Sequence, residues 1–290
     1  MAEAFALSQF ESLRSTPEKV LPLPDLEQVV QDVWQEISSS CDVNSVVLNV
    51  HYDYTLFSQP AYLNTLAVAE RTTWLIDGVW TPAALLPPNL RYLGGSIDVK
   101  VNPYTPNGFF VDDGSCEVGN HFDLKTILRH EFLHGVGVSS SFKILNGVED
   151  VGFSTGSGSG CYPFLLDTKM RTSMNKEVIS GCQVLSNISI SDPLFVNGIE
   201  MYNPSTYDPG SSYHHANVPN TLIYYGIPAR KCLYVDETEK ALLEAIGARC
   251  TGNFAVVNTP QSGASRTRPD FYVFILVVVI LKCLMIRLHL

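Results

Sequence analysis

The chain has few basic residues and lacks the C-x-x-C motif of cysteine zinc sites and redox centres. It carries 19 Lys and Arg against 29 Asp and Glu, a formal charge of −10, with no basic run. Nucleic acid binds to clustered cations, so no nucleic-acid partner is expected. No C-x-x-C pair occurs, which argues against a cysteine zinc site or a thioredoxin-like redox centre. Hydrophobic residues make up 46% of the 290 residues, enough for one large domain or two small lobes.

A secretory signal peptide is also missing from the start of the chain. Residues 1–24 have neither a basic start nor a useful apolar stretch, so a loose N-terminal leader is expected. After a linker at 257–270, the hydrophobic tail at 271–290, interrupted by Lys282, predicts membrane association through a span or a lipid-anchor signal. The body would then lie at the cell surface or in the secretory pathway. A tail anchor without a signal peptide would instead leave it in the cytosol.

Six of the seven cysteines lie in the body of the chain. Their even number favours three disulfides in an extracytoplasmic compartment. On spacing alone, Cys161 is expected to pair with Cys182, and Cys232 with Cys250. The alternative is that the cysteines are small buried apolar residues in a reducing compartment.

The hydrophobic pattern predicts both helices and strands. Asp25 is the expected N-cap of a helix, because apolar residues at helical spacing follow it. Strands are expected at 44–54 and at 94–103, where β-branched and polar residues alternate in part. Further helices are expected after a cap at Asp123 and over 236–250.

The helix after Asp123 carries the most specific motif of the chain, H-E-x-x-H, at His130, Glu131 and His134. Positions i and i+4 of a helix lie on one face, so the two histidines can direct their imidazoles at a single zinc ion. Glu131 projects near the same site and can accept a proton from a metal-bound water as a general base. The pattern predicts zinc-dependent hydrolysis. The competing interpretation is an accidental histidine pair on an ordinary helix.

The third zinc ligand is not adjacent to this motif. Gly137 follows three residues on, where a glycine ends the helix in one type of zinc peptidase before a third histidine. In the pattern H-E-x-x-H-x-x-G-x-x-H the last position is Ser140 here, and a serine is a poor replacement. His214 and His215 lie far downstream in a polar loop. An inserted segment could return either of them to the zinc.

These features resemble the metzincin zinc endopeptidases. The stretch RHEFLHGVGVSSS, a later GSSYHHA and then NTLIYYG are similar to members with a long insertion before the third histidine, as in leishmanolysin. The resemblance covers roughly Val29 to Ala248. It implies zinc as the cofactor and protein or peptide substrates. It also implies His215 as the third ligand, with His214 as the alternate.

The same resemblance implies an α+β fold, with a metzincin-like, two-lobed catalytic domain over residues 25–256. The N-lobe (25–140) would hold a twisted sheet and the active-site helix. The C-lobe (141–256) would be irregular and contain the insertion. The substrate cleft would run along the strand at 94–103, because an edge strand of the family pairs with extended peptide there.

Two departures from the family pattern bear on activity. Ile223 stands in place of the methionine beneath the zinc, and Val138 in place of an aromatic residue. Tyr225 matches a tyrosine that assists at the zinc in some metzincins, although a packing role is an equal alternative. Retention of Glu131 favours an active endopeptidase. The alternative is a catalytically inactive metzincin-like module that binds at a surface.

Overall fold

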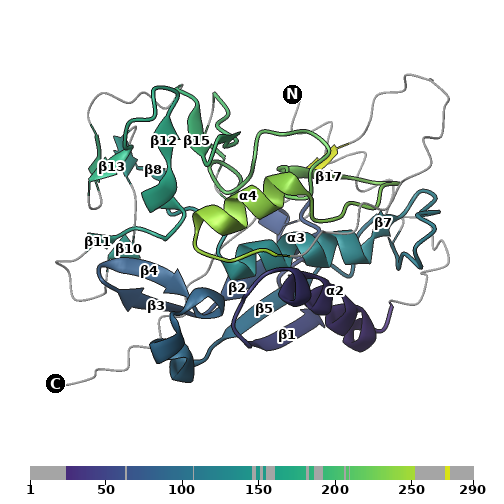
Figure 1. Cartoon of the computed structure of the whole chain (residues 1–290). Helices are drawn as coiled ribbons and strands as arrows, with labels where there is room; N and C mark the ends of the chain where they lie inside the picture. Colours follow the sequence, from purple (N-terminus) through teal and green to yellow (C-terminus); the bar gives the residue numbers. More distant parts are fainter. Residues whose placement is uncertain are drawn as a thin grey trace.

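The computed structural model describes residues 24–62, 64–106, 108–145, 148–150, 153–154, 161–180, 183–185, 192–205, 207–208, 210–251 and 272–274. In this part of the chain, helices and strands form a mixed α+β fold (Figure 1). The α+β class expected from the sequence is therefore confirmed.

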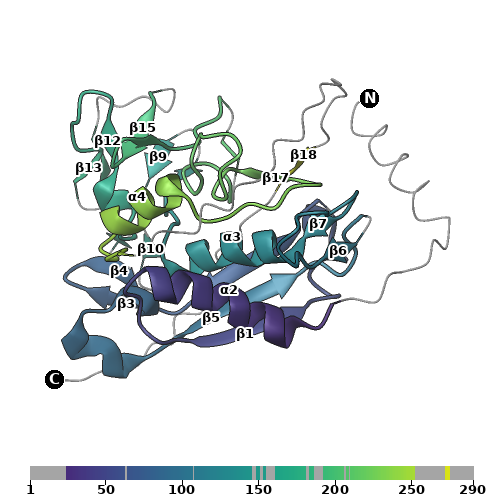
Figure 2. The same cartoon turned by 45° about the vertical axis from the view of Figure 1, so that its right-hand side comes forward.

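A three-stranded sheet forms the base of the N-terminal half. Strand β1 (Val47–Tyr52) pairs in parallel with β5 (Ser96–Val101), which pairs antiparallel with β2 (Ala67–Arg71). Helices α2 (Leu26–Ser40) and α3 (Leu124–Val136) cover one face of this sheet (Figure 2). Both helices pack closely against the sheet.

A glycine permits this close contact between α3 and the sheet. A Cβ added at Gly135 would lie 2.4 Å from Cγ2 of Ile97 on β5, a separation that two carbons cannot adopt. Ile97, Val99 and Val101 alternate along β5 and are buried, as expected for a strand with one face covered. The strand and its inward face agree with the sequence pattern.

Helix α2 begins and packs as its sequence predicts. The Asp25 carboxylate accepts a hydrogen bond from the backbone amide of Glu27 at 3.1 Å, which caps the first turn. Val33 on its inner face is fully buried. The Trp34 ring meets Phe132 of α3 edge to face, with centroids 5.6 Å apart. The apolar stripe of α2 therefore holds α3 against the sheet.

The remaining elements are short, and many of them belong to the C-terminal half. Helix α4 (Glu237–Ala245) crosses above α3 (Figure 1). Strands β12 (Arg171–Thr172), β15 (Leu194–Val196) and β16 (Ile199–Glu200) form a second three-stranded sheet. In chain order, the other elements are η1 (Pro60–Tyr62), β3 (Thr73–Ile76), β4 (Val79–Pro82), η2 (Ala83–Leu85), η3 (Pro88–Leu93), β6 (Phe109–Phe110), β7 (Phe122–Asp123), β8 (Lys143–Leu145), β9 (Val148–Asp150), β10 (Phe153–Ser154), β11 (Cys161–Tyr162), η4 (Asp167–Lys169), β12 (Arg171–Thr172), β13 (Ile179–Ser180), β14 (Gln183–Val184), β15 (Leu194–Val196), β16 (Ile199–Glu200), β17 (Gly226–Pro228) and β18 (Tyr272–Phe274).

The strand at 94–103, expected to be the edge strand that pairs with a peptide, does not lie at an edge. The strand predicted at 94–103 is β5, the central strand, which pairs on both sides. The edge strand beside α3 is β2 (Ala67–Arg71), antiparallel to its neighbour. The sequence did not reveal β2, because Ala67 to Ala69 are all buried and the strand shows no period-two alternation.

Two disulfides join distant parts of the chain. Cys41 bonds to Cys250 and Cys116 to Cys232, with Cα–Cα distances of 3.9 and 5.7 Å. The predicted pair Cys232–Cys250 is therefore wrong. Spacing along the sequence misled because Cys41, directly after α2, lies beside Cys250, in the segment that follows α4, and the two also form a backbone β-bridge. Both bonds tie the N-terminal half to the C-terminal half.

Removal of one bridge should lower stability measurably. A bond that closes a loop of about 100 residues stabilises by up to about 4.7 kcal/mol in the chain-entropy model, and native bonds typically contribute about 2–5 kcal/mol. Cys116→Ser with Cys232→Ser removes a bond of sequence separation 116. Urea unfolding should show a lower midpoint in the double variant. In the presence of reductant, the midpoint of the wild type should fall as low as that of the double variant, or lower. An unchanged midpoint would contradict the pairing.

Several expectations fall on residues outside those described. They concern the leader, the linker, Cys182 and the hydrophobic tail except β18 (Tyr272–Phe274). Cys161 is disulfide-bonded. Strand β18 pairs antiparallel with β17 (Gly226–Pro228). Among the described residues, no helix has the length and apolar character needed to cross a membrane.

Candidate metal centre

Helix α3 begins and ends at residues that fix the motif in place. The Asp123 carboxylate accepts hydrogen bonds from the backbone amides of Lys125 and Thr126 at 3.2 and 2.9 Å. After the helix, Gly137 adopts φ +135°, and a Cβ there would lie 2.8 Å from Cγ of Pro82. Only glycine fits this position without strain. The chain therefore leaves the helix directly after the motif, as predicted.

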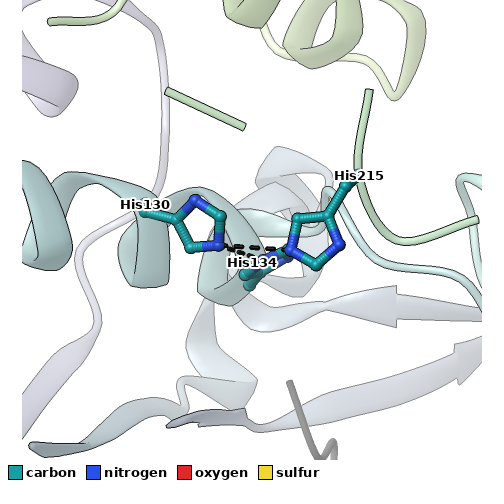
Figure 3. Close-up of side chains that lie close together, drawn as sticks. All are labelled: His130, His134 and His215. Atoms are coloured by element: carbon teal, nitrogen blue, oxygen red, sulfur yellow. Dashed lines mark hydrogen bonds between the residues drawn. The ribbon is translucent and has the colours of Figure 1, made fainter. Parts of the chain in front are cut away.

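Three histidines converge beside this helix. His130 and His134 lie one turn apart on α3, and His215 follows His130 by 85 positions. All three are fully buried. Their rings point toward one another (Figure 3), and one nitrogen of each lies within 4.8 Å of the others. Helix α3 and the loop that carries His215, far apart in the sequence, therefore contribute side chains to one site.

Each ring is oriented by a backbone carbonyl group. The Nδ1 atoms of His130, His134 and His215 lie 2.7, 2.5 and 3.0 Å from the carbonyl oxygens of Leu222, Val138 and Ser211, respectively. A carbonyl oxygen can only accept a hydrogen bond, so Nδ1 carries the proton in each ring. Each neutral ring consequently keeps its lone pair on Nε2. Carbonyl partners of this kind are what metal-binding histidines use to fix their orientation.

Burial keeps the three imidazoles uncharged. It lowers the pKa of His130 to about 4, and it lowers the pKa values of His134 and His215 well below the usual range. The physical cause is that a buried imidazolium loses its hydration. Neighbouring rings lower the pKa of His134 and His215 further. Neutral imidazole is the form that binds metal ions.

The Nε2 atoms face one another at short range. Nε2 of His130 lies 3.0 Å from Nε2 of His134 and 3.3 Å from Nε2 of His215 (Figure 3). Because the Nδ1 atoms hold the protons, these contacts bring lone pairs together. A cation between the three nitrogens would turn this repulsion into attraction. The three histidines can therefore hold a metal ion.

The carboxyl group of Glu131 belongs to the residue directly after His130 on α3. It is fully buried, and among the described residues neither of its oxygens has a hydrogen-bond partner. Burial raises the pKa of Glu131 to about 8, and the nearby backbone amide of Ala69 on β2 opposes this only in part. A buried polar group without a partner is costly. One explanation for such a group in a native structure is a chemical role, such as proton transfer.

His214 and Ser140 lie near the cluster but make their hydrogen bonds with residues outside it. Nδ1 of His214 lies 3.0 Å from the Ser139 hydroxyl oxygen. The Ser140 hydroxyl donates to the buried carboxylate of Asp167 at 2.6 Å. The structure thus brings His215, rather than His214, to the helix histidines. Neither the alternate ligand nor the serine at the short-motif position is part of the group.

The residues that depart from the family pattern lie close to the orienting carbonyls. Ile223 is fully buried and follows Leu222, whose carbonyl orients His130. Val138 supplies another of the three carbonyls. The Tyr225 ring stacks on Tyr202 with centroids 3.9 Å apart. A catalytic role for Tyr225 stays a prediction.

Glu239 is a residue of this region that the sequence reading missed. It is a fully buried glutamate on α4, and one of its oxygens accepts from the backbone amide of Ile223 at 2.9 Å. The D-x-x-E pattern from Asp236 to Glu239 signals a capping box, which the structure contains. That local signal cannot reveal a contact to a residue 16 positions away.

Comparison with known proteins gives no relative: no protein-family model, curated protein or solved structure matches the chain.

Proposed function

We propose that the chain is a zinc-dependent endopeptidase with a metzincin-like fold. His130, His134 and His215 hold the zinc ion, and Glu131 is the general base. The observation that carries this proposal is the meeting of three neutral, carbonyl-oriented imidazoles, with a buried carboxyl that lacks a hydrogen-bond partner among the described residues at the position directly after His130. The resemblance of the motif to metzincins agrees with it.

Zinc suits this donor set better than harder cations. Imidazole nitrogens favour zinc and other transition metals, whereas magnesium and calcium prefer oxygen. Zn–N bonds of about 2.0–2.1 Å at tetrahedral angles separate two nitrogens by about 3.3 Å. The two Nε2 separations around His130 are 3.0 and 3.3 Å. Three protein ligands also leave a fourth position open, as catalytic zinc requires.

Glu131 supplies the proton transfer that peptide hydrolysis needs. When bound, zinc polarises a peptide carbonyl and makes a water molecule more acidic. Glu131 then takes the proton from the attacking water and passes it to the leaving amine. The ionised form that a base requires would be favoured by a cation held by the three histidines, which would offset the effect of burial on the pKa of Glu131.

Strand β2 is the element that best suits an extended peptide. It is one of the two edge strands of its sheet, the one that packs against α3, and Ala69 on it lies near Glu131. An added strand would bind through main-chain hydrogen bonds and tolerate many side chains. This assigns the substrate-binding role to β2 instead of the strand at 94–103.

Complete burial of the site favours a second candidate function. His130, Glu131, His134 and His215 are all 0% exposed, so a peptide can reach them only when a covering segment moves. A chain that holds zinc without admitting a peptide would be an inactive, metzincin-like binding module. Ile223 in the place of the family's methionine agrees with either candidate, since isoleucine also fills apolar space.

Metal analysis combined with a peptide-library digest separates these possibilities. We expect one zinc per chain, loss of peptide cleavage after chelation, and recovery on addition of about one equivalent of zinc. His130→Ala should lose both properties. His51→Ala, at an exposed histidine on β1, is the matched control and should keep both. Zinc binding without cleavage would select the inactive module. A wild type that binds no zinc would exclude both.

A further inference from the structure

Glu239 makes two hydrogen bonds of different kinds from one buried carboxyl group. Its Oε2 accepts from the backbone amide of Asp236 at 2.9 Å, which is half of the capping box of α4. Its Oε1 accepts from the backbone amide of Ile223 at 2.9 Å. The first bond serves the helix. The second ties α4 to the turn beneath the three histidines.

Ile223 lies between the contacts of two histidines. The carbonyl of Leu222, directly before it, accepts from Nδ1 of His130 at 2.7 Å. Its own carbonyl accepts from the backbone amide of Ala216 at 3.0 Å, and Ala216 directly follows His215. A displacement of Ile223 would therefore disturb an α3 histidine and the loop histidine together.

The Ile223 amide depends on Glu239 for its hydrogen bond. Ile223 and Glu239 are both 0% exposed, so water is not at hand to replace a lost partner. A buried amide without an acceptor is unfavourable, and the turn would shift to relieve it. Outer partners that orient metal ligands affect metal affinity by about 10–100-fold.

We propose that Glu239 is a positioning residue of the metal centre, holding the Leu222–Ile223 turn so that His130 and His215 face the same point. This rests on the proposed metal-binding function of the three histidines, but not on peptidase activity. Glu239 acts through the backbone and touches neither ring. Its expected effect is therefore at the lower end of the outer-partner range, about tenfold in zinc affinity.

The test compares variants of α4 in the full-length chain. Glu239→Met keeps the length and helix preference of the side chain but lacks an acceptor. Glu239→Gln can accept from only one of the two amides. Asp236→Ala removes the side-chain cap of α4 while leaving Glu239 and its bond to Ile223. Glu237→Ala changes a side chain that is 89% exposed on the same helix turn.

Zinc affinity is measured by competition with a chelator, well below the melting temperature of each variant. The visible spectrum of the Co²⁺-loaded protein reports the ligand geometry directly. We expect Glu239→Met to bind zinc about tenfold more weakly, with an altered Co²⁺ spectrum, and Glu239→Gln to fall between it and the wild type. Asp236→Ala should lose thermal stability but keep wild-type affinity and spectrum. Glu237→Ala should change neither.

Wild-type affinity and spectrum in Glu239→Met would overturn the proposal while leaving the proposed function intact. Equal losses of affinity in Asp236→Ala and Glu239→Met would also overturn it, because helix stability would then explain both. If Glu239→Met does not fold, Glu239→Gln decides, and an unchanged affinity in that variant counts against the proposal. A wild type that binds no metal overturns both the positioning role and the function on which it rests.

Discussion

His215→Ala should abolish tight zinc binding and, with it, peptide cleavage. The variant leaves two helix nitrogens 3.0 Å apart, and two neutral imidazoles hold the ion far more weakly than three. The loss should exceed the roughly 10–100-fold that changes in outer partners cost. Chelator competition and metal analysis of the purified variant measure it directly. The fold should survive, because among the described residues the hydrogen-bonding contacts of the removed ring are only a backbone bond to Ser211 and the contact with His130.

His214→Ala is the matched control for this prediction. The two histidines are neighbours in the same loop, and both are buried, at 6% and 0% exposure. Nδ1 of His214 hydrogen-bonds with the Ser139 hydroxyl, and His214 is not one of the three grouped histidines, so its removal should leave zinc affinity near the wild-type value. If His214→Ala abolished zinc binding while His215→Ala did not, the ligand would be the adjacent residue. If neither variant changed affinity, the third ligand would lie elsewhere and the metal-centre proposal would lose its basis.

The local parts of the site could be predicted because short-range chemistry determines them. Asp123 caps α3 with its own carboxylate, and Gly137 ends the helix with a positive φ. Between them, the i and i+4 spacing alone places His130 and His134 on one face. Each of these features depends on residues within about one helical turn, so the sequence pattern contains all the information needed.

The long-range parts could not be read in the same way. The Cys232–Cys250 prediction was wrong because spacing along the chain does not show which segments meet in space, and Cys41 meets Cys250 across a separation of 209 residues. The sequence pattern did not predict strand β2, because burial on both faces removes the alternation that marks a strand. The carbonyls that orient the histidines are backbone groups, for which side-chain identity gives no signal. The contact of Glu239 with Ile223 is also set by tertiary packing alone.

Glu131 differs from the other buried acids of the fold in its lack of partners. Glu239 accepts two backbone hydrogen bonds, and Asp167 accepts from Ser140 and other donors. Neither oxygen of Glu131 has a donor within hydrogen-bonding distance among the described residues, although the side chain is 0% exposed, and the nearby backbone amide of Ala69 offsets only part of the effect of burial on its pKa. The lack of a donor to these oxygens is expected of a group that exchanges protons with a substrate or water.

Glu131→Gln should keep zinc but lose about 10²–10⁴-fold in turnover, the usual contribution of a general base. Gln preserves the size of the side chain and cannot accept the proton. Glu237→Gln, on the exposed surface of α4, should leave both turnover and zinc content unchanged. Zinc content is determined by metal analysis, and turnover with a peptide identified in the library digest. Wild-type turnover in Glu131→Gln would remove Glu131 from the mechanism.

The same substitution should change how the stability of the metal-free protein depends on pH. Burial raises the pKa of Glu131 from 4.5 to about 8 in the folded state, so folding favours the protonated form. The stability that this proton gives is fully present below about pH 4.5 and is lost as pH rises toward 8. Gln has no proton to lose. The stability of Glu131→Gln relative to the wild type, from thermal unfolding of the metal-free proteins, should therefore rise between pH 5 and pH 8.5. Taking the difference cancels the titration of the three histidines, which both proteins share. A constant difference across this range would show that Glu131 is not held in an environment that disfavours its charge.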